Sequence, residues 1–172
     1  ARAGKNPDAV KIVAVTKSVD AETIRNLIEA GVTTFGENRV QQLVARASEL
    51  NQYLQRRRNP LPSPIEWHMI GHLQRNKVRH VLDVAEVIHS VDSLRLAEAV
   101  NERAERMNKP AAVLLQVNCS EEQQKFGVAV AAALHLAELM QTLKHLRLQG
   151  LMTMAAAVDN PEKARPVFVR CR

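Results

Sequence analysis

The sequence predicts an α/β protein of the (β/α)8 TIM-barrel type, of which this chain supplies about six βα units. Short β-branched runs alternate with longer amphipathic stretches at a spacing of about thirty residues, which is typical of βαβ units around a parallel sheet. A polar residue ends most of these runs, and barrels place their chemistry at the carboxyl ends of strands. The alternative, an open dinucleotide-binding sheet, predicts a glycine-rich turn after the first strand. The residues there are Thr, Lys, Ser, Val and Asp (16–20), and no GxGxxG or Walker motif occurs in the chain.

Six runs predict the strands, and they span residues 11–17, 33–38, 65–71, 86–91, 111–118 and 146–153. The first run, Lys-Ile-Val-Ala-Val-Thr-Lys, is apolar on both faces, as expected of a buried strand in a parallel sheet. The polar residues at the strand ends are Lys17, Asn38, His68, Ser90, Asn118 and Thr153. Because parallel strands end at one edge of a sheet, we expect these side chains around the mouth of the barrel.

The amphipathic stretches between the runs predict helices, which span residues 21–30, 40–57, 74–82, 92 or 93 to about 108, 129–144, and 160 onward. Asp20 is a good N-cap for the first of them, and Gly31 is a good residue to end it. Asn160 followed by Pro161 predicts the start of the last helix, since proline is favoured in a first helical turn.

Composition predicts one domain, residues 1–172, with an ordinary globular core: 46% of the residues are apolar and 24% are charged. The longest apolar run, residues 128–134, is too short to cross a bilayer, and no charged-then-apolar leader opens the sequence. We therefore expect no membrane partner and a cytoplasmic location. Cys119 and Cys171 belong to no CxxC motif, so neither a disulfide framework nor a thiolate metal site is predicted.

The net charge of +6 leaves several kinds of partner open, among them nucleic acid and an anionic small ligand. The tight basic cluster is Arg56, Arg57 and Arg58, which precedes a Pro-rich loop at residues 59–64. Three Phe, one Tyr and one Trp provide no stacking platform for single strands, so nucleic-acid binding is disfavoured.

Lys17 is the foremost candidate for chemistry. On a strand it shares a face with Val13 and Val15. A lysine at the mouth of an apolar barrel loses hydration, which disfavours the ammonium and leaves an amine able to attack an aldehyde. The alternative is an ordinary strand-end lysine that faces water.

His68 and His72 form an HxxxH pair, but on a strand residues four apart lie about 13 Å from each other. No HExxH glutamate accompanies them, so we expect no metal site. His68 is interpreted either as a hydrogen-bond donor lining the mouth or as a satisfied core histidine.

Three further segments carry two interpretations each. Asn38 and Asn118 either cap the turns after their strands or bond a ligand across the mouth. The turn at residues 71–77, with Arg75 and Lys77, either holds an anion or is a solvated helix start. Residues 125–127, Lys-Phe-Gly, follow the polar loop 120–124 and are a candidate lid over the mouth.

Seven segments taken in order resemble the pyridoxal phosphate homeostasis protein family (YggS/PROSC-like), whose fold is similar to the N-terminal barrel of alanine racemase. They are residues 13–17, 35–38, 67–77, 89–93, 116–118, 125–127 and 150–153, and the block Trp-His-Met-Ile-Gly-His-Leu-Gln-Arg-Asn-Lys is the most specific. The resemblance implies that pyridoxal 5′-phosphate (PLP) forms a Schiff base with Lys17. It also implies that the cofactor-binding residues include Asn38, His68, Ser90, Asn118 and Met152, and that PLP-dependent apoenzymes are possible partners.

The sequence departs from the family pattern in four places. Arg39 stands where the family has Tyr, and Glu121 stands where it has Gly. The family's helix before the first strand is reduced to residues 1–8, and its last two βα units are missing from the chain. In the family those units carry the groups that hold the PLP phosphate. We therefore expect an incomplete barrel that keeps the lysine and lacks the phosphate cup.

Three functions follow. The first is a non-enzymatic PLP carrier and regulator in vitamin B6 and amino-acid homeostasis, with no catalytic residue. The second is a PLP-dependent racemase, which needs a second acid or base on the opposite face of the substrate carbon. Tyr53, the single tyrosine, lies late in the second helix, far from the mouth. The third is a basic RNA- or protein-binding module built on Arg56 to Arg58.

Overall fold

The computed structural model describes residues 4, 6–58, 61, 63–122 and 124–172, and it contains one six-stranded parallel sheet. The strands are β1 (Ala14–Val15), β2 (Thr34–Glu37), β3 (Glu66–Met69), β4 (Val87–Val91), β5 (Ala111–Gln116) and β6 (Leu146–Met152). Their spatial order is the order in the chain, β1-β2-β3-β4-β5-β6. A doubly wound sheet reverses its strand order at a switch point, whereas a barrel wall does not. The predicted partial barrel is therefore confirmed.

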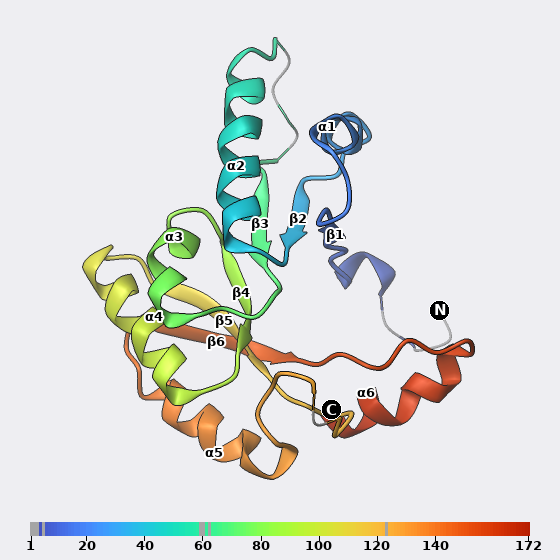
Figure 1. Ribbon diagram of the computed structural model, residues 1–172, viewed down its shortest axis with the longest axis vertical. Helices are drawn as coiled ribbons and strands as arrows, with labels where there is room; N and C mark the ends of the chain where they lie inside the picture. The colour runs from blue at the N-terminus through green and yellow to red at the C-terminus, as the bar shows by residue number, and fades with distance from the viewer. Residues whose placement is uncertain (1–3, 5, 59–60, 62, 123) are drawn as a thin grey trace.

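Helices follow the strands in regular alternation. They are α1 (Ala21–Glu29), α2 (Val40–Gln55), α3 (Val78–Leu82), α4 (Leu94–Arg106), α5 (Val130–Gln141) and α6 (Arg165–Cys171), with short 3₁₀ turns at Pro7–Ala9, Arg75–Lys77 and Pro161–Ala164. Figure 1 shows α2, α3, α4 and α5 along one face of the curved sheet. The other face of the sheet is the barrel lumen, and strand side chains line it.

The main hydrophobic core lies between the sheet and the helices that cover it. Phe35 of β2 and Trp67 of β3 are both buried, and their ring centroids lie 5.5 Å apart. Leu43 of α2 and Val100 of α4 are fully buried in the same core. Since side chains alternate along a strand, these apolar positions leave every second residue to face the lumen.

The predicted strand at residues 11–17 is wrong in its length. β1 has two residues, and within the described part of the chain it pairs with β2 alone, through Ala14 and Val15. As an edge strand it has a neighbour on one side only, so Ile12 is 81% exposed and Val15 49% exposed. An apolar run predicts burial of a strand on both faces, but it contains no information about whether both edges are paired.

Several helix boundaries follow the local signals. The Asp20 carboxylate accepts a hydrogen bond from the Thr23 backbone N–H at 2.8 Å, which confirms the predicted cap of α1. The Asn160 side chain caps the 3₁₀ turn that precedes α6. The predicted helix 74–82 is shorter, because its first turn, Arg75–Lys77, is 3₁₀. In the predicted Pro-rich loop, residues 59, 60 and 62 lie outside the described part of the chain.

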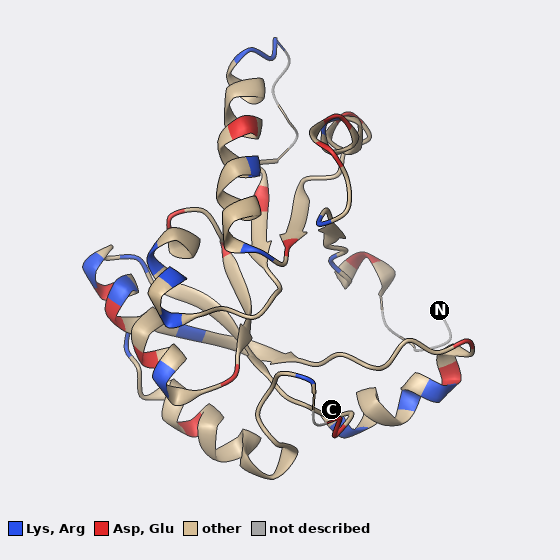
Figure 2. Ribbon diagram, viewed as in Figure 1, with Lys and Arg blue, Asp and Glu red and all other residues tan. Residues whose placement is uncertain are grey.

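Within the described residues, no helix is both long enough and apolar enough to cross a membrane. Figure 2 shows Lys and Arg mixed with Asp and Glu on the outer helices, α4 among them. In the basic cluster at the end of α2, Arg57 forms an ion pair with Glu29 of α1. At least one of the three arginines therefore contributes to packing between helices.

Candidate functional site

The carboxyl ends of the strands carry most of the predicted site residues. Lys17 lies in the turn directly after β1, Asn38 follows β2, Asn118 follows β5, and Met152 ends β6. Lys17 is exposed and the other three are partly buried. The expectation that Lys17 is desolvated on a strand is therefore not met in this structure, because β1 ends two residues before it.

The turn that carries Lys17 is held by a buried ion pair. The Glu37 side chain is completely buried at the end of β2, and it pairs with Arg46 of α2. The Thr16 hydroxyl donates to Glu37 Oε1 at 2.6 Å. The Arg46 guanidinium also donates to the backbone carbonyls of Thr16 and Val19, the latter at 2.6 Å. These contacts fix the backbone on both sides of Lys17.

The ends of β2 and β3 approach each other closely beside that turn. A Cβ added at Gly71 would lie 2.1 Å from the Asn38 carbonyl oxygen, so only glycine fits there. The Ile70 N–H donates to the Glu37 carbonyl at 2.9 Å. The close approach fixes the backbone of Asn38 at the mouth.

The loop after β5 reaches across the mouth. Its ends are joined by a bridge between Val117 and Val128. The Phe126 ring stacks on the His72 ring of the β3–α3 loop, with centroids 4.1 Å apart and ring planes 12° apart. The Lys125 ammonium pairs with Glu122 at 2.6 Å. Because only β4 lies between β3 and β5, the stack joins two loops of the mouth above the end of β4.

Asn118 shapes this loop. Its side-chain amide donates to the Glu122 carbonyl at 2.9 Å and its side-chain oxygen accepts from the Ser120 hydroxyl at 3.1 Å. The turn-forming interpretation of Asn118 is therefore the one the contacts favour. Residue 123, within the predicted polar loop, lies outside the described residues. A cavity of about 130 Å³ beneath the loop is lined by Gln116, Asn118, Lys125, Phe126 and Met154, among others.

His68 lies deeper than the mouth, in the wall of the lumen. Its Nδ1 is 2.8 Å from Nε2 of His89 on β4, and the two imidazoles share a hydrogen bond. Burial lowers the pKa of His68, partly offset by the nearby Glu66 carboxylate. Burial and the neighbouring His68 lower the pKa of His89 to about 4. The pair is therefore neutral at pH 7.

Two buried polar atoms in this wall have no hydrogen-bond partner among the described residues. They are Oγ of Ser90 and Nε2 of His68, and the latter lies 3.8 Å from Oε2 of Glu66, too far for a hydrogen bond but close enough for an electrostatic contact. Buried polar atoms are nearly always paired, so an unpaired one indicates a place for a ligand or water. His72 is separate from this pair, since it lies 3.7 Å from Asp92 and stacks on Phe126. Within the described residues, no three His, Cys, Asp or Glu side chains gather as metal ligands would.

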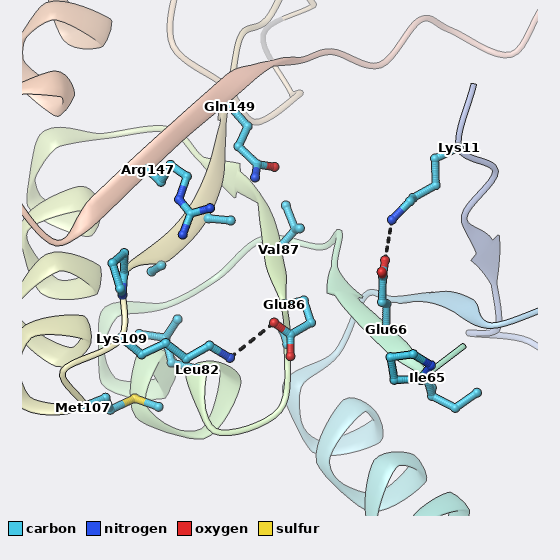
Figure 3. A pocket seen from close by; sticks show the side chains of 15 residues that line it. Lys11, Ile65, Glu66, Leu82, Glu86, Val87, Met107, Lys109, Arg147 and Gln149 are labelled. Carbon is cyan, nitrogen blue, oxygen red and sulfur yellow. Dashed lines mark hydrogen bonds and ion pairs between the residues drawn. The ribbon is translucent and has the colours of Figure 1, made fainter. Parts of the chain in front are cut away.

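A larger cavity, about 470 Å³, lies at the amino ends of the strands (Figure 3). Two ion pairs line it, Lys11 with Glu66 at 2.5 Å and Lys109 with Glu86 at 3.3 Å. Glu66 begins β3, so this cavity is at the opposite end of the sheet from Lys17. Its charges are largely neutralised in pairs.

The two cysteines, distant in sequence, lie close together in space. Both are free, and Cys119 is buried just after β5. Burial and the neighbouring Cys119 raise the pKa of the Cys171 thiol on α6. Arg170 donates to the Cys119 carbonyl at 3.0 Å, which helps to dock α6 beside the β5 loop.

Sequence reasoning missed three of the residues that shape the site: Glu37, Arg46 and His89. Glu37 ends a predicted strand, and its burial follows only once α2 packs over it. The helical period places Arg46 on α2 but does not predict the turn that it contacts. His89 lies in the segment 89–93 that resembles the family, but the sequence does not show that it pairs with His68. The pairing depends on the register of β3 and β4, in which His68 is opposite Val87.

Comparisons with known proteins agree with this geometry. A family model for the N-terminal domain of alanine racemase matches residues 1–169. The pyridoxal phosphate homeostasis protein of Aquifex aeolicus is 34% identical, over 99% of this chain and 71% of that protein. The protein of the same name from Pasteurella multocida is 39% identical, over 96% of this chain and 68% of that protein. The chain spans about two thirds of the length of such relatives.

Solved structures give the same picture. A protein of unknown function from Bifidobacterium adolescentis has a TM-score of 0.87 at 38% identity, over 99% of this chain and 69% of that one. PipY of Synechococcus elongatus, solved with PLP bound, has a TM-score of 0.78 at 31% identity, over 99% of this chain and 74% of that one. An alanine racemase of Clostridium difficile, at 18% identity and a TM-score of 0.73 over 96% of this chain and 41% of that one, shares the fold.

Proposed function

Because this chain belongs to the pyridoxal phosphate homeostasis protein family, we propose that it binds PLP as a Schiff base on Lys17 and acts as a non-enzymatic carrier of that cofactor. The observation that carries the proposal is the state of Lys17 at the mouth. Among the described residues, none forms a hydrogen bond or ion pair with its ammonium, whereas Lys125 at the same mouth pairs with Glu122. When bound, PLP supplies an aldehyde, and an unpaired amine is the group that condenses with it.

The surrounding residues fit a small planar ligand with polar edges. The buried Ser90 hydroxyl lacks a hydrogen-bond partner in the described structure, so it can bond to a ligand or its water, whereas Nε2 of His68 lies 3.8 Å from the Glu66 carboxylate. Asn38 and Met152 flank the mouth at the ends of β2 and β6. We propose Lys17 as the covalent residue and Asn38, His68, Ser90, Asn118 and Met152 as the residues around the cofactor. Asn118 acts through the loop that it shapes.

Borohydride reduction followed by peptide mapping tests the covalent residue. We expect the pyridoxyl group on Lys17, and we expect Lys17→Ala to abolish trapping. Lys109→Ala is the matched control, because Lys109 lies in the cavity at the other end of the sheet and should leave trapping unchanged. The proposal is wrong if Lys17→Ala still traps the cofactor on another lysine.

The carrier role rather than a racemase is supported by the position of the tyrosine. Tyr53 donates to Glu29 at 2.7 Å. It lies near the end of α2, about 20 Å along the helix from the mouth at 1.5 Å per residue. A two-base racemase needs an acid or base close to the reacting carbon on the face opposite the lysine. In this proposal the chain passes PLP to PLP-dependent apoenzymes in the cytoplasm.

Alanine racemisation and deuterium exchange with added PLP test this second part. We expect no turnover near the enzymatic range of about 1–1000 per second. Turnover in that range by the purified chain, abolished in Lys17→Ala, would establish a racemase and contradict the carrier role.

A further inference from the structure

We propose that Arg46 is the positioning residue for Lys17, holding the turn of residues 16–19 so that the Lys17 amine is presented at the mouth. This inference rests on the proposed role of Lys17. Arg46 is on α2, whose first turns lie beside the carboxyl end of β2 (Figure 1). It touches no part of the Lys17 side chain in the contacts described above, and it acts through the backbone.

The contacts of Arg46 converge on that turn. One terminal nitrogen, Nη1, donates both to the Thr16 carbonyl and to Glu37 Oε1. The other, Nη2, donates to the Val19 carbonyl at 2.6 Å. The Val19 N–H donates back to the Thr16 carbonyl at 3.2 Å and closes the turn. The two carbonyls bound by the guanidinium therefore bracket Lys17 and Ser18.

Burial makes this arrangement rigid. The Glu37 side chain is completely buried and the Arg46 side chain is 16% exposed. A buried carboxylate without a counter-charge is strongly unfavourable, so Glu37 fixes the guanidinium and the guanidinium fixes the turn. A guanidinium presents its donors in a rigid fork, which suits three acceptors in fixed positions.

The shortness of β1 explains why the turn at residues 16–19 needs the contacts with Arg46. β1 has two residues and, among the residues that the structure describes, pairs only with β2, so this short ladder alone holds the following turn weakly. Beyond the strand, the Thr16 N–H donates to the Gly36 carbonyl at 3.1 Å. A lysine on an unfixed turn would have to be ordered on binding, and that ordering reduces affinity.

Another arginine offers a matched comparison. Arg25 of α1 pairs with Glu49 of α2 at 2.9 Å, so it too joins α2 to the first βα unit. It contacts no backbone carbonyl of the turn at residues 16–19 in the described structure. A general loss of ion pairing on α2 would therefore affect Arg25 and Arg46 variants alike, whereas positioning of Lys17 affects only the Arg46 variants.

Two variants distinguish the geometry of the Arg46 guanidinium from the positive charge that it provides for Glu37. Arg46→Lys keeps a counter-charge for Glu37 but cannot span three acceptors. The double variant Glu37→Gln with Arg46→Gln removes both charges, so no unpaired carboxylate remains to unfold the chain. Arg25→Gln is the control. The readouts are amide hydrogen exchange of residues 17–19 without PLP, the Kd for PLP by absorbance, and the site of borohydride trapping.

We expect Arg46→Lys to raise both the exchange at residues 17–19 and the Kd about tenfold, the scale of one or two lost hydrogen bonds. The double variant should raise both at least as much, and Arg25→Gln should change neither. Unchanged exchange and Kd in both Arg46 variants overturns the inference. So does an equal rise in exchange throughout β2 to β5, because that result means a purely structural role.

The experiments distinguish a failure of the proposed Schiff base from a failure of the proposed role of Arg46. If the unsubstituted chain traps no pyridoxyl group on Lys17, the covalent role is wrong whatever Arg46 does. The exchange measurement contains no PLP, so it still reports whether Arg46 holds the turn. An Arg46 effect on exchange without any effect on Kd overturns the positioning role and leaves the Schiff base on Lys17 intact.

Discussion

At the scale of single residues, the hydrogen-bonded imidazoles of His68 and His89 are the site's clearest titratable pair. Burial keeps both neutral in the folded chain, and it lowers the pKa of His89 to about 4. An unfolded histidine has a pKa near 6.5. Between these two values the unfolded chain binds a proton that the folded chain does not.

The pair therefore makes stability depend on pH. The contribution of His89 to stability should be constant above about pH 6.5 and fall as the pH drops from 6.5 to 4, by up to about 3 kcal/mol at roughly 1.4 kcal/mol per unit. His89→Gln keeps a hydrogen-bonding group near the position of Nε2 but cannot take up a proton. Urea denaturation at several pH values should show a smaller loss for this variant. An identical pH profile in the two chains would contradict the assignment.

The site residues also show where sequence reasoning reaches its limit. Lys17, Asn38 and Asn118 follow from their places at strand ends, and the structure places all three at the mouth. Arg46 does not follow, because its role depends on which side of α2 packs over β2 and on a turn that lies 27 residues away at Val19. Such contacts are set by tertiary packing, which local patterns do not encode.

At the scale of elements, one aromatic contact joins the loop after β5 to the β3–α3 loop. The Phe126 side chain is 56% exposed, and its stack on His72 joins the loop to the β3–α3 loop. An aromatic pair of this kind contributes about 0.5–1.5 kcal/mol. Gln116 also donates to the Phe126 carbonyl at 3.2 Å, so we expect loss of the ring to loosen the loop without releasing it.

Limited proteolysis measures this loosening directly, since trypsin cuts after Lys125. Phe126→Ala should speed this cleavage about two- to tenfold, because the closed state loses the aromatic contact. Phe168→Ala is a suitable control, since Phe168 is similarly exposed but lies on α6. Equal cleavage rates for Phe126→Ala and the unsubstituted chain would show that the stack does not hold the loop.

The elements themselves were largely predictable. All six strands form where β-branched runs predict them, and Asp20 and Asn160 cap as expected. The errors are in length, at β1 and at α3. β1 is short because it lies at an edge of the sheet, and α3 because its first turn winds as 3₁₀. Both depend on neighbours in space, so periodicity alone could not give them.

At the scale of the whole molecule, β1 and β6 are the edge strands of the sheet that the described residues form. β6 is seven residues long and, among the described residues, pairs only with β5, so no described strand pairs with its outer backbone groups. An exposed edge of this kind is a template for pairing with another chain. The order of the six strands was predictable from their spacing, whereas the pairing of the two edge strands with another chain was not.

We expect a chain of residues 1–172 to self-associate through these edges in a concentration-dependent way. Leu151→Lys, which places a charge on β6, should weaken the association because charged edges disfavour strand pairing. Leu134→Lys is the matched control, since Leu134 is exposed on the helix α5 and is not part of an edge strand. Sedimentation across a range of concentrations distinguishes them. A monomer at every concentration would refute the edge model.

The sequential strand order also bears on how the chain is made. Each strand pairs with the one synthesised just before it, so every new βα unit meets a partner that has already emerged from the ribosome. At roughly 5–20 residues per second, a unit of about thirty residues is added every few seconds, which is slow compared with the formation of local structure. The wall can therefore grow unit by unit during translation, with Lys17 and its turn the first part of the site to be produced.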